Sequence, residues 1–193
     1  MKILFVRHGE SVDDIEDRYG GWADFDLTEK GKRQVTAATE KIASLNTTFE
    51  IVLTSPLKRA FQTAEIISNK LNLNLDVLEY LKERNLNGIL TGLTRNEAKT
   101  KYPKLVEAHS NWEYVDGSER TQDFDKRVKN ACYYLLGTNY NSMIVVTHGL
   151  FLKSFFKETM DVGVAKVGDG GFALVEVENK NFKVLKMDGI ELG

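Results

Sequence analysis

The sequence predicts an α/β fold, a three-layer sandwich in which helices cover both faces of a mostly parallel, mixed sheet. Short apolar runs alternate along the chain with longer amphipathic segments, as strands and helices do in such folds. The runs from Ile3 to Val6, Ile51 to Leu53 and Met143 to Val146 are apolar throughout, which is typical of parallel strands buried on both faces. Two further runs, at residues 171–178 and 181–187, are joined by a turn at Asn179-Lys180-Asn181. This turn predicts a terminal hairpin and hence an antiparallel part of the sheet.

Strands are predicted where a short run of branched or aromatic residues is bounded by polar or turn-forming residues. Such runs occupy residues 2–6, 50–54, 74–78, 142–147, 171–178 and 181–187. Helices are predicted where apolar residues recur every three or four positions, at residues 28–45, 57–71, 94–102, 120–137 and 149–159. In the first helix Val35, Ala38 and Ile42 form one face, and Thr28 is placed to cap the first turn.

One domain is expected to span residues 1–193, because the length suits a single core and no linker or repeat interrupts the chain. Residues 84–120 are its irregular part, and we expect a helical excursion or a lid over the site. The net charge of −2 argues against bulk capture of nucleic acid, and no apolar stretch approaches the ~18 residues of a membrane span. The first strand follows Met1-Lys2 without a secretory signal, so we expect a cytoplasmic protein.

Two residues with reactive side chains have ordinary interpretations. Cys132, the only cysteine, lies on a helical face with Phe124 and Val128, so a buried core thiol is preferred over a catalytic or redox role. His109 lies in a polar stretch, which favours placement on the surface or in the lid. No His, Cys and Asp residues have metal-ligand spacing, and neither a P-loop nor a dinucleotide fingerprint is present. We therefore expect no metal and no cofactor, and neither ATP hydrolysis nor hydride transfer is supported.

Three predicted strands lead into residues that suit anion binding. The first leads into Arg7-His8-Gly9, the second into a segment with Arg59, and the fourth into His148-Gly149. Arginine is a permanently charged, fork-shaped phosphate ligand, and histidine is a nucleophile or proton carrier near neutral pH. Ligands in open α/β sheets bind at the carboxyl ends of the strands. We therefore expect two arginines and two histidines to meet on one anion.

Four motifs along the chain resemble those of the histidine phosphatase superfamily, also called the phosphoglycerate mutase-like family. They are Arg7-His8-Gly9-Glu10-Ser11, Leu27-Thr28-Glu29-Lys30-Gly31, the segment Ser55 to Ala64, and Thr147-His148-Gly149. The resemblance covers nearly the whole chain and implies the phosphoglycerate mutase-like fold. It also implies metal-free phosphoryl transfer.

The resemblance implies a role for each of several residues. His8 would attack phosphorus and become a phosphohistidine, which splits one displacement into two easier steps. Arg7, Arg59 and His148 would neutralise the oxygens of the transferring group. Glu83 stands where the family carries the acid that protonates the leaving oxygen, with a solvated glutamate as the alternative. The residues implied to bind substrate or phosphate are Arg7, His8, Gly9, Asp14, Gly21, Arg59, His148 and Gly149.

Three features depart from the family's pattern, and one of them, Lys153 in the place of an arginine shortly after His148-Gly149, is expected to have little effect on the chemistry. The spacing from Glu83 to Gly88 is one residue longer than usual, and Asp14 stands where the family often carries a phosphate-binding asparagine. An ionised Asp14 repels phosphate at short range. We expect its carboxylate to turn away from the phosphate or to contact a cationic or hydroxyl part of the substrate.

Hydrolysis of a phosphomonoester is favoured over mutase-type phosphoryl transfer. Only 13 residues separate Pro103 from Gly117, where mutases carry a longer insertion with paired arginines, and this chain has no adjacent arginine pair. A mutase must also shield its phosphorylated intermediate from water. Residues 88–97 nevertheless resemble the mutase segment, so phosphoglycerate mutase-type transfer is the alternative. A weakly catalytic module that binds phosphorylated ligands or proteins is the alternative from another class.

The expected partner is a small phosphorylated metabolite, with a nucleotide or a phosphoprotein left open. The segment from Gly117 to Arg127 resembles a further family region and is expected to be structural support. Phe172 and Val177, on a terminal hairpin at the edge of the sheet, could pair two chains, so a homodimer is an open expectation. Side chains that could line the entrance are Trp22, Arg84, Arg95, Trp112, Tyr114 and Arg120.

Overall fold

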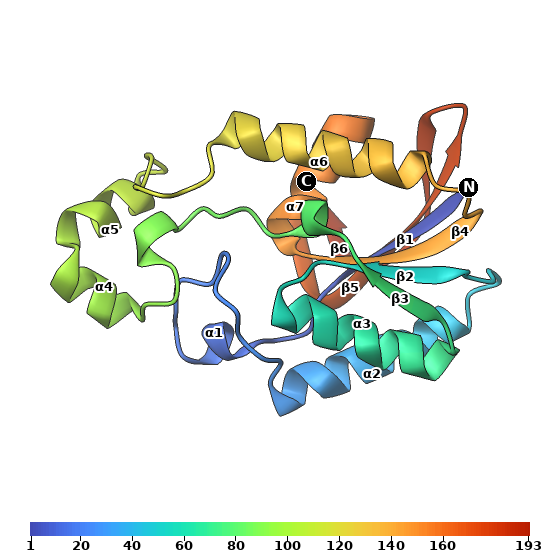
Figure 1. Ribbon diagram of the computed structural model, residues 1–193, viewed down its shortest axis with the longest axis horizontal. Helices are drawn as coiled ribbons and strands as arrows, with labels where there is room; N and C mark the ends of the chain where they lie inside the picture. Colours follow the sequence, from blue (N-terminus) through green and yellow to red (C-terminus); the bar gives the residue numbers. More distant parts are fainter.

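A computed structural model describes residues 1–193 and contains one six-stranded sheet with the order β3-β2-β4-β1-β5-β6 (Figure 1). The first four strands in this order are parallel to one another, and β5 is antiparallel to both β1 and β6. The predicted mixed sheet is therefore confirmed. The strands are β1 (Lys2–Arg7), β2 (Ile51–Thr54), β3 (Asn74–Val77), β4 (Ser142–Thr147), β5 (Val164–Glu178) and β6 (Asn181–Leu192).

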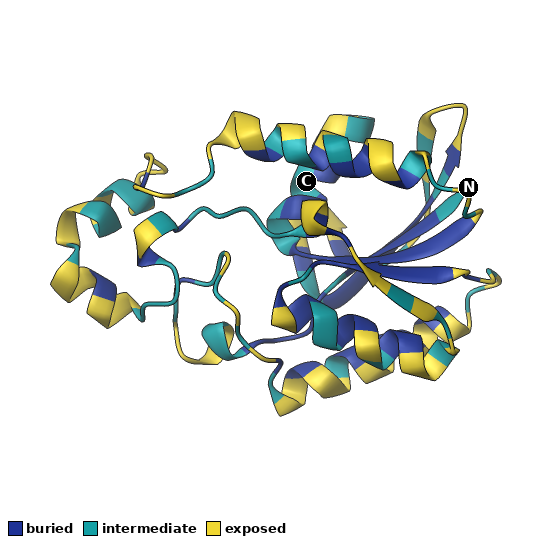
Figure 2. Cartoon of the chain, viewed as in Figure 1, coloured by how far each residue is buried: buried dark blue, intermediate teal, exposed yellow.

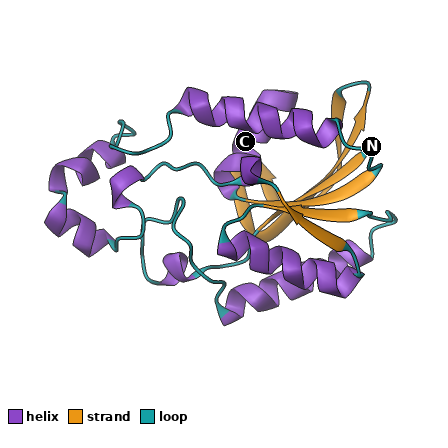
Figure 3. Cartoon of the chain, viewed as in Figure 1, coloured by secondary structure: helices purple, strands orange, loops and turns teal.

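Helices cover both faces of the sheet, as the sequence predicts. In Figures 1 and 3, α6 and α7 lie on one side of the strands, and α2 and α3 lie on the other. Thr28 caps α2, because its side chain accepts a hydrogen bond from the backbone N–H of Gly31 at 2.9 Å. The helices are α1 (Val12–Ile15), α2 (Glu29–Ala43), α3 (Lys58–Leu71), α4 (Arg95–Lys101), α5 (Pro103–Ser110), α6 (Thr121–Leu136) and α7 (Gly149–Met160), with short 3₁₀ turns η1 (Glu79–Leu81) and η2 (Gly88–Leu90).

The strands divide their apolar side chains between two cores. Because successive side chains of a strand point to opposite faces, Ile3 and Phe5 join the α6/α7 core and Leu4 and Val6 join the α2/α3 core. Each fully buried side chain of this size contributes about 1.5–3 kcal/mol of hydrophobic stabilisation. Figure 2 shows the result, with the central strands β1, β2 and β4 buried and β3 largely exposed at the edge of the sheet. No helix has both the length and the apolar character that crossing a membrane needs.

The predicted burial of Cys132 is confirmed. Its side chain lies in the α6/α7 core with Phe124 and Val128. Burial raises the pKa of the thiol to about 12, so the thiolate needed for catalysis or redox chemistry does not form near neutral pH.

The irregular segment 84–120 is a helical excursion. It contains η2, α4 and α5, which lie at one end of the molecule away from the sheet (Figure 1). A separate apolar cluster of Tyr19, Leu90, Ala98 and Val115 holds the excursion together. The sequence predicted only the first of its two α-helices. Pro103 stops α4 and begins α5 at a position where a missing backbone N–H costs nothing.

The expectation for Phe172 and Val177 is wrong. The strand β5 begins at Val164 and lies between β1 and β6, so the edge of the sheet is β6. Phe172 is 1% exposed and Val177 is 7% exposed, on opposite faces of the sheet. These side chains fill the two cores and are not free to pair chains. The homodimer itself stays a prediction.

Candidate active site

The histidines predicted at two strand ends lie beside each other. The strands β1 and β4 are parallel neighbours, so His8 and His148 leave the sheet at the same edge. Their ring centroids are 5.0 Å apart. Ser55, which follows the next parallel strand β2, reaches the same point. The predicted convergence of the strand ends is therefore present.

Hydrogen bonds fix which nitrogen of His8 is free to react. Nδ1 lies 2.7 Å from the carbonyl of Gly9 and must carry the proton to donate to it. Nε2 accepts a hydrogen bond from Nε of Arg59 at 3.2 Å, so it holds a lone pair. Burial, followed by the charges of Arg59 and Arg7, holds the pKa of His8 well below 6.5. The imidazole is therefore neutral and nucleophilic near neutral pH.

His148 has one nitrogen without a partner. Its Nε2 lies 2.8 Å from the hydroxyl of Ser55, and that hydroxyl also accepts a hydrogen bond from the backbone N–H of Leu57. The hydroxyl hydrogen can be donated to Nε2, and in that arrangement the proton of the neutral ring is on Nδ1. Nδ1 is buried with no hydrogen-bond partner, and burial followed by the charge of Arg59 holds the pKa of His148 well below 6.5. A buried, unpaired N–H is a donor that a bound anion would satisfy.

Arg59 is held by backbone carbonyls. Its Nη1 donates to Ala23 at 2.9 Å and its Nη2 donates to Gly21 at 2.8 Å. The side chain is buried, and this burial lowers its pKa from the usual value, although an arginine stays charged. Gly21 was expected to bind phosphate. Its backbone carbonyl orients Arg59 and the residue lines the cleft, and phosphate binding by Gly21 stays a prediction.

Arg7 is anchored by strand β5. Its Nη1 donates to the carbonyl of Val167, and its Nη2 lies 3.1 Å from the carboxylate of Asp169. Its Nε is buried without a partner. Two groups on one strand therefore hold the guanidinium, and one N–H is left for an anion.

Asp169 is a functional candidate that the sequence analysis missed. It lies in a bulge of β5, where the pairing register shifts between Val167 and Phe172 and Gly170 adopts a φ of +68°. The N–H of Gly170 donates to the carbonyl of His8 at 3.1 Å. Burial raises the pKa of Asp169, and the charge of Arg7 opposes that rise. The run Gly168 to Gly171 was a signal, because glycines within a strand often mark a bulge.

Glu83 lies at the N-terminal end of α7. Its carboxylate accepts hydrogen bonds from the backbone N–H groups of Arg84 at 2.8 Å, Leu150 at 3.1 Å and Phe151 at 3.2 Å. A Cβ at Gly149 would lie 3.7 Å from Nε of Arg7 and 4.0 Å from Oε2 of Glu83. Gly149 thus keeps side-chain atoms out of the space between Arg7, which is expected to bind phosphate, and Glu83, the expected acid.

The segment that carries Glu83 is braced from α6. Arg127 makes a two-point ion pair with Glu119, with N–O distances of 2.8 and 2.7 Å. It also donates to the carbonyls of Tyr80, Lys82 and Glu83. This bracing agrees with the expected supporting role of the segment from Gly117 to Arg127.

Asp14 and Gly9 have structural contacts of their own. The carboxylate of Asp14 accepts hydrogen bonds from the backbone N–H of Ser11 at 2.9 Å and from its hydroxyl at 3.3 Å, which caps α1. A Cβ at Gly9 would lie 2.5 Å from the carbonyl oxygen of Gly31, so the chain passes there only as glycine. Asp14 also lines the cleft, so a contact with a hydroxyl or cationic part of the substrate stays open.

Arg7, His8, Arg59 and Glu83 line one cleft of about 290 Å³, whereas His148 is fully buried and is not part of its lining. His109, on α5 of the helical excursion, forms part of the wall of this cleft, with its Nε2 2.9 Å from Oδ1 of Asn87. Five arginines face three carboxylates, and this excess of positive charge favours an anion. The lining residues are Arg7, His8, Asp13, Asp14, Arg18, Gly20, Gly21, Arg59, Glu83, Arg84, Leu86, Asn87, Arg95, His109 and Leu150.

Comparison with known proteins identifies the family and the fold. The model of one family, the histidine phosphatase superfamily (branch 1), matches residues 3–188. The alpha-ribazole phosphatase from Shigella flexneri has a TM-score of 0.85 and 20% identity, over 100% of this chain and 98% of that one. YhfR of Bacillus stearothermophilus has a TM-score of 0.83 and 24% identity, over 97% and 96%. A phosphoglycerate mutase from Bacillus anthracis has a TM-score of 0.79 and 19% identity, over 98% and 92%. At these identities the solved structures show the fold alone, which phosphatase and mutase share.

Proposed function

The chain belongs to the histidine phosphatase superfamily, and from this premise we propose that it hydrolyses phosphomonoesters through a phosphohistidine on His8. The observation that carries the proposal is the unprotonated Nε2 of His8, buried beside Arg59 at 3.2 Å. The cationic side chains supply the charge that a metal ion supplies in other phosphoryl transfers, so none is required.

In the first step a bond forms between Nε2 of His8 and phosphorus as the bond from phosphorus to the ester oxygen breaks. Arg7, Arg59 and the Nδ1–H of His148 bind the phosphoryl oxygens. Such preorganised donors each contribute about 3 kcal/mol of barrier lowering. The protonated carboxyl of Glu83 gives its proton to the ester oxygen, which leaves as an alcohol.

In the second step water replaces the alcohol. The carboxylate of Glu83 takes a proton from the water as its oxygen attacks phosphorus and the phosphorus–nitrogen bond of His8 breaks. Inorganic phosphate leaves, Glu83 is protonated again, and His8 returns to the neutral tautomer held by Gly9. After a full cycle the charge and the protonation state of the enzyme are the same as at the start.

Mutase-type transfer is the second candidate. It is favoured by residues 88–97, which form η2 and the start of α4 and place Arg95 at the cleft. Hydrolysis is favoured by the short connection from Pro103 to Gly117. One helix, α5, takes up most of it, and no paired arginines lie there.

The test uses p-nitrophenyl phosphate and a panel of phosphoglycerates and sugar phosphates, with and without EDTA. Hydrolysis that is lost in His8→Ala and unaffected by EDTA supports the proposal. Exchange of phosphate between phosphoglycerate positions, without release of phosphate, identifies a mutase. Absence of turnover and of any trapped phosphohistidine on every compound would identify a binding module instead.

A further inference from the structure

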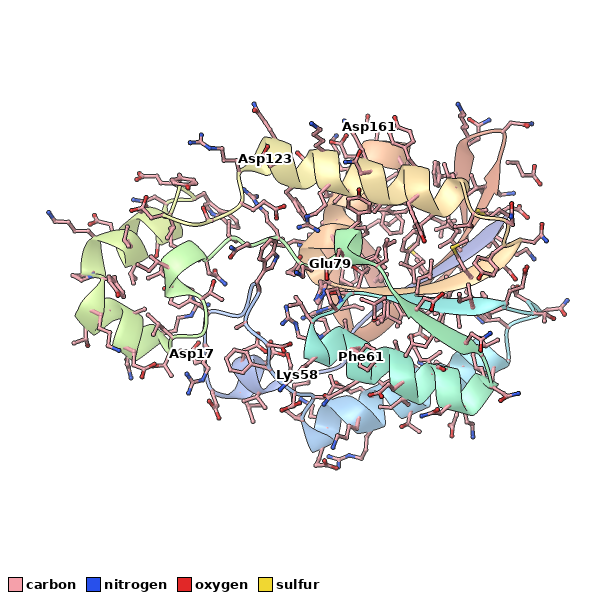
Figure 4. All side chains as sticks on the ribbon, in the orientation of Figure 1. Asp17, Lys58, Phe61, Glu79, Asp123 and Asp161 are labelled. Carbon is pink, nitrogen blue, oxygen red and sulfur yellow. The ribbon has the colours of Figure 1, made fainter.

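A second cleft adjoins the proposed catalytic one. It also holds about 290 Å³, close to the lower end of the volumes of ~300–1,000 Å³ that small-molecule sites occupy. The two clefts share Arg84 and Leu86 in their walls. The second cleft is otherwise formed by the connection between α5 and α6 and by the start of α6, where Asp123 is labelled in Figure 4.

The chemistry of the first cleft directs a leaving group toward the second. Phosphoryl transfer places the attacking and leaving atoms roughly in line through phosphorus. With Nε2 of His8 attacking, the leaving oxygen lies on the far side, within reach of Glu83. Arg84 follows Glu83 directly, donates its backbone N–H to that carboxylate at 2.8 Å, and lines both clefts. Arg84 therefore connects the expected leaving-group side of the first cleft with the second cleft.

The second cleft offers flat, exposed surfaces. Trp112 is 78% exposed and Tyr114 is 52% exposed. The guanidinium of Arg120 lies over the ring of Tyr114, with its Cζ 5.0 Å from the ring centroid, so one face of that ring is covered and Trp112 is the free aromatic surface. Exposed aromatic side chains beside a polar cleft are the usual platform for a planar ring, because stacking needs only a π-face.

The connection that carries Trp112 is held in place. Trp112 has a left-handed backbone with a φ of +61°. Its backbone N–H donates to the carbonyl of His109 at 3.1 Å, and that of Glu113 donates to Ala108 at 2.9 Å. The ring is therefore presented by a fixed turn at the end of α5.

Arg84 adds an unpaired donor at the junction of the clefts. Its Nη2 donates to the hydroxyl of Thr121 at 2.8 Å, whereas its Nε is buried without a partner. A ring nitrogen or a hydroxyl of a ligand would satisfy that N–H.

The opposite wall of the catalytic cleft offers fewer free groups. Arg18 donates to the carboxylate of Glu16 at 2.6 Å, and Arg95 is stacked on Tyr19 with its Cζ 3.7 Å from the ring centroid. His109 is already bonded to Asn87. These side chains are occupied within the protein, so the leaving group finds its free partners on the Trp112 side.

We propose that the second cleft receives a planar heteroaromatic ring of the leaving group, stacked on Trp112. The preferred substrate is then a phosphomonoester of a ring-bearing sugar alcohol, in the manner of a nucleoside 5′-monophosphate. This inference rests on the proposed function.

The test compares adenosine 5′-monophosphate with ribose 5-phosphate. Both release the same primary alcohol oxygen from the same sugar, so a difference in kcat/KM reports the ring. We expect kcat/KM to be at least about ten-fold higher for the nucleotide, which is within the range of one stacked ring. Trp112→Ala should abolish this preference and leave hydrolysis of ribose 5-phosphate within about two-fold. Tyr133→Ala removes an aromatic side chain that is 73% exposed on α6 and lines neither cleft, so the preference should survive.

The outcomes separate the two proposals. Hydrolysis of p-nitrophenyl phosphate that depends on His8, with equal kcat/KM for the nucleotide and ribose 5-phosphate, overturns the ring cleft alone. A preference that persists in Trp112→Ala, or a larger preference for a phosphopeptide, overturns it as well. Absence of hydrolysis of all compounds overturns the proposed function.

Discussion

The Nε of Arg59 donates to Nε2 of His8 across 3.2 Å, while its two Nη atoms are held by backbone carbonyls. The guanidinium of Arg59 therefore orients the expected nucleophile and presents positive charge where phosphate would bind. Lysine has a single charged nitrogen and cannot make this set of contacts.

Arg59→Lys should lower kcat for p-nitrophenyl phosphate by about 100-fold, as the loss of one preorganised charged donor does elsewhere. The control is Lys58→Ala, at the exposed start of α3 in Figure 4, which should keep normal kcat. Activity of Arg59→Lys within about two-fold of the parent protein would contradict the role of the guanidinium.

Burial of the two site histidines should make the protein less stable in acid. The pKa values of His8 and His148 are lowered well below 6.5, first by burial and then by the charge of Arg59. Between the lowered pKa and about 6.5, the unfolded state binds protons that the native state does not. The stabilising contribution is therefore complete above pH ~6.5 and is lost as the pH falls, by up to about 1.4 kcal/mol per pH unit for each histidine.

Urea unfolding from pH 7.5 down to pH 5 measures this loss. His8→Asn removes one titrating group, so its free energy of unfolding should fall less steeply than that of the parent protein. The other titratable groups contribute equally to the pH dependence of both proteins, so their contribution cancels in the comparison. Parallel curves would show that His8 is not held neutral in the native state.

Glu83→Gln tests the acid. Glutamine keeps one accepting oxygen, which can serve the N–H groups of Arg84 and Phe151 or that of Leu150, and its amide cannot act as a general acid. Hydrolysis of an alkyl phosphate should slow by about 100-fold or more, the usual contribution of general acid catalysis. The p-nitrophenolate leaving group needs little protonation, so its release should slow less. The control is Glu79→Gln, which should slow neither substrate. Glu79 is labelled in Figure 4 and pairs with Lys82 at the η1 turn. Equal slowing of both substrates would remove Glu83 from this role.

Asp169→Ala tests the anchor of Arg7. Without the carboxylate 3.1 Å from its Nη2, the guanidinium keeps only the carbonyl of Val167. Misplacement of a substrate-binding group by about 1 Å costs up to 100-fold, so we expect kcat to fall by at least about ten-fold. Asp169→Asn keeps a hydrogen-bond acceptor and should recover part of the loss. Asp188→Ala removes a nearby carboxylate that is paired with Lys41 and should leave kcat unchanged. Normal kcat in Asp169→Ala would mean that Val167 alone orients Arg7.

Much of the fold could be read from local patterns. The apolar runs of β1, β2 and β4 and the faces of α2 and α6 are strong signals, because burial on both faces or on one stripe leaves a distinct periodicity. The short helices α1 and α5 were missed. The helix α5 packs Leu105 and Val106 against the small cluster around Tyr19 and Leu90, and α1 is a single turn held by its capping box rather than by an apolar pattern.

The sequence by itself determined which side chains each strand delivers to its end. Arg7 and His8 follow β1, and His148 follows β4, because chain order and strand length are local properties. The tertiary structure decided the partners. The order of the strands places β1 beside β4, which aligns residues about 140 positions apart, and it inserts the β5 bulge with Asp169 against Arg7. It also decided that the carbonyl of Gly21 contacts Arg59 and that Trp112 and Arg84 border one cleft. Such contacts depend on packing between distant segments, and no periodicity within one segment records them.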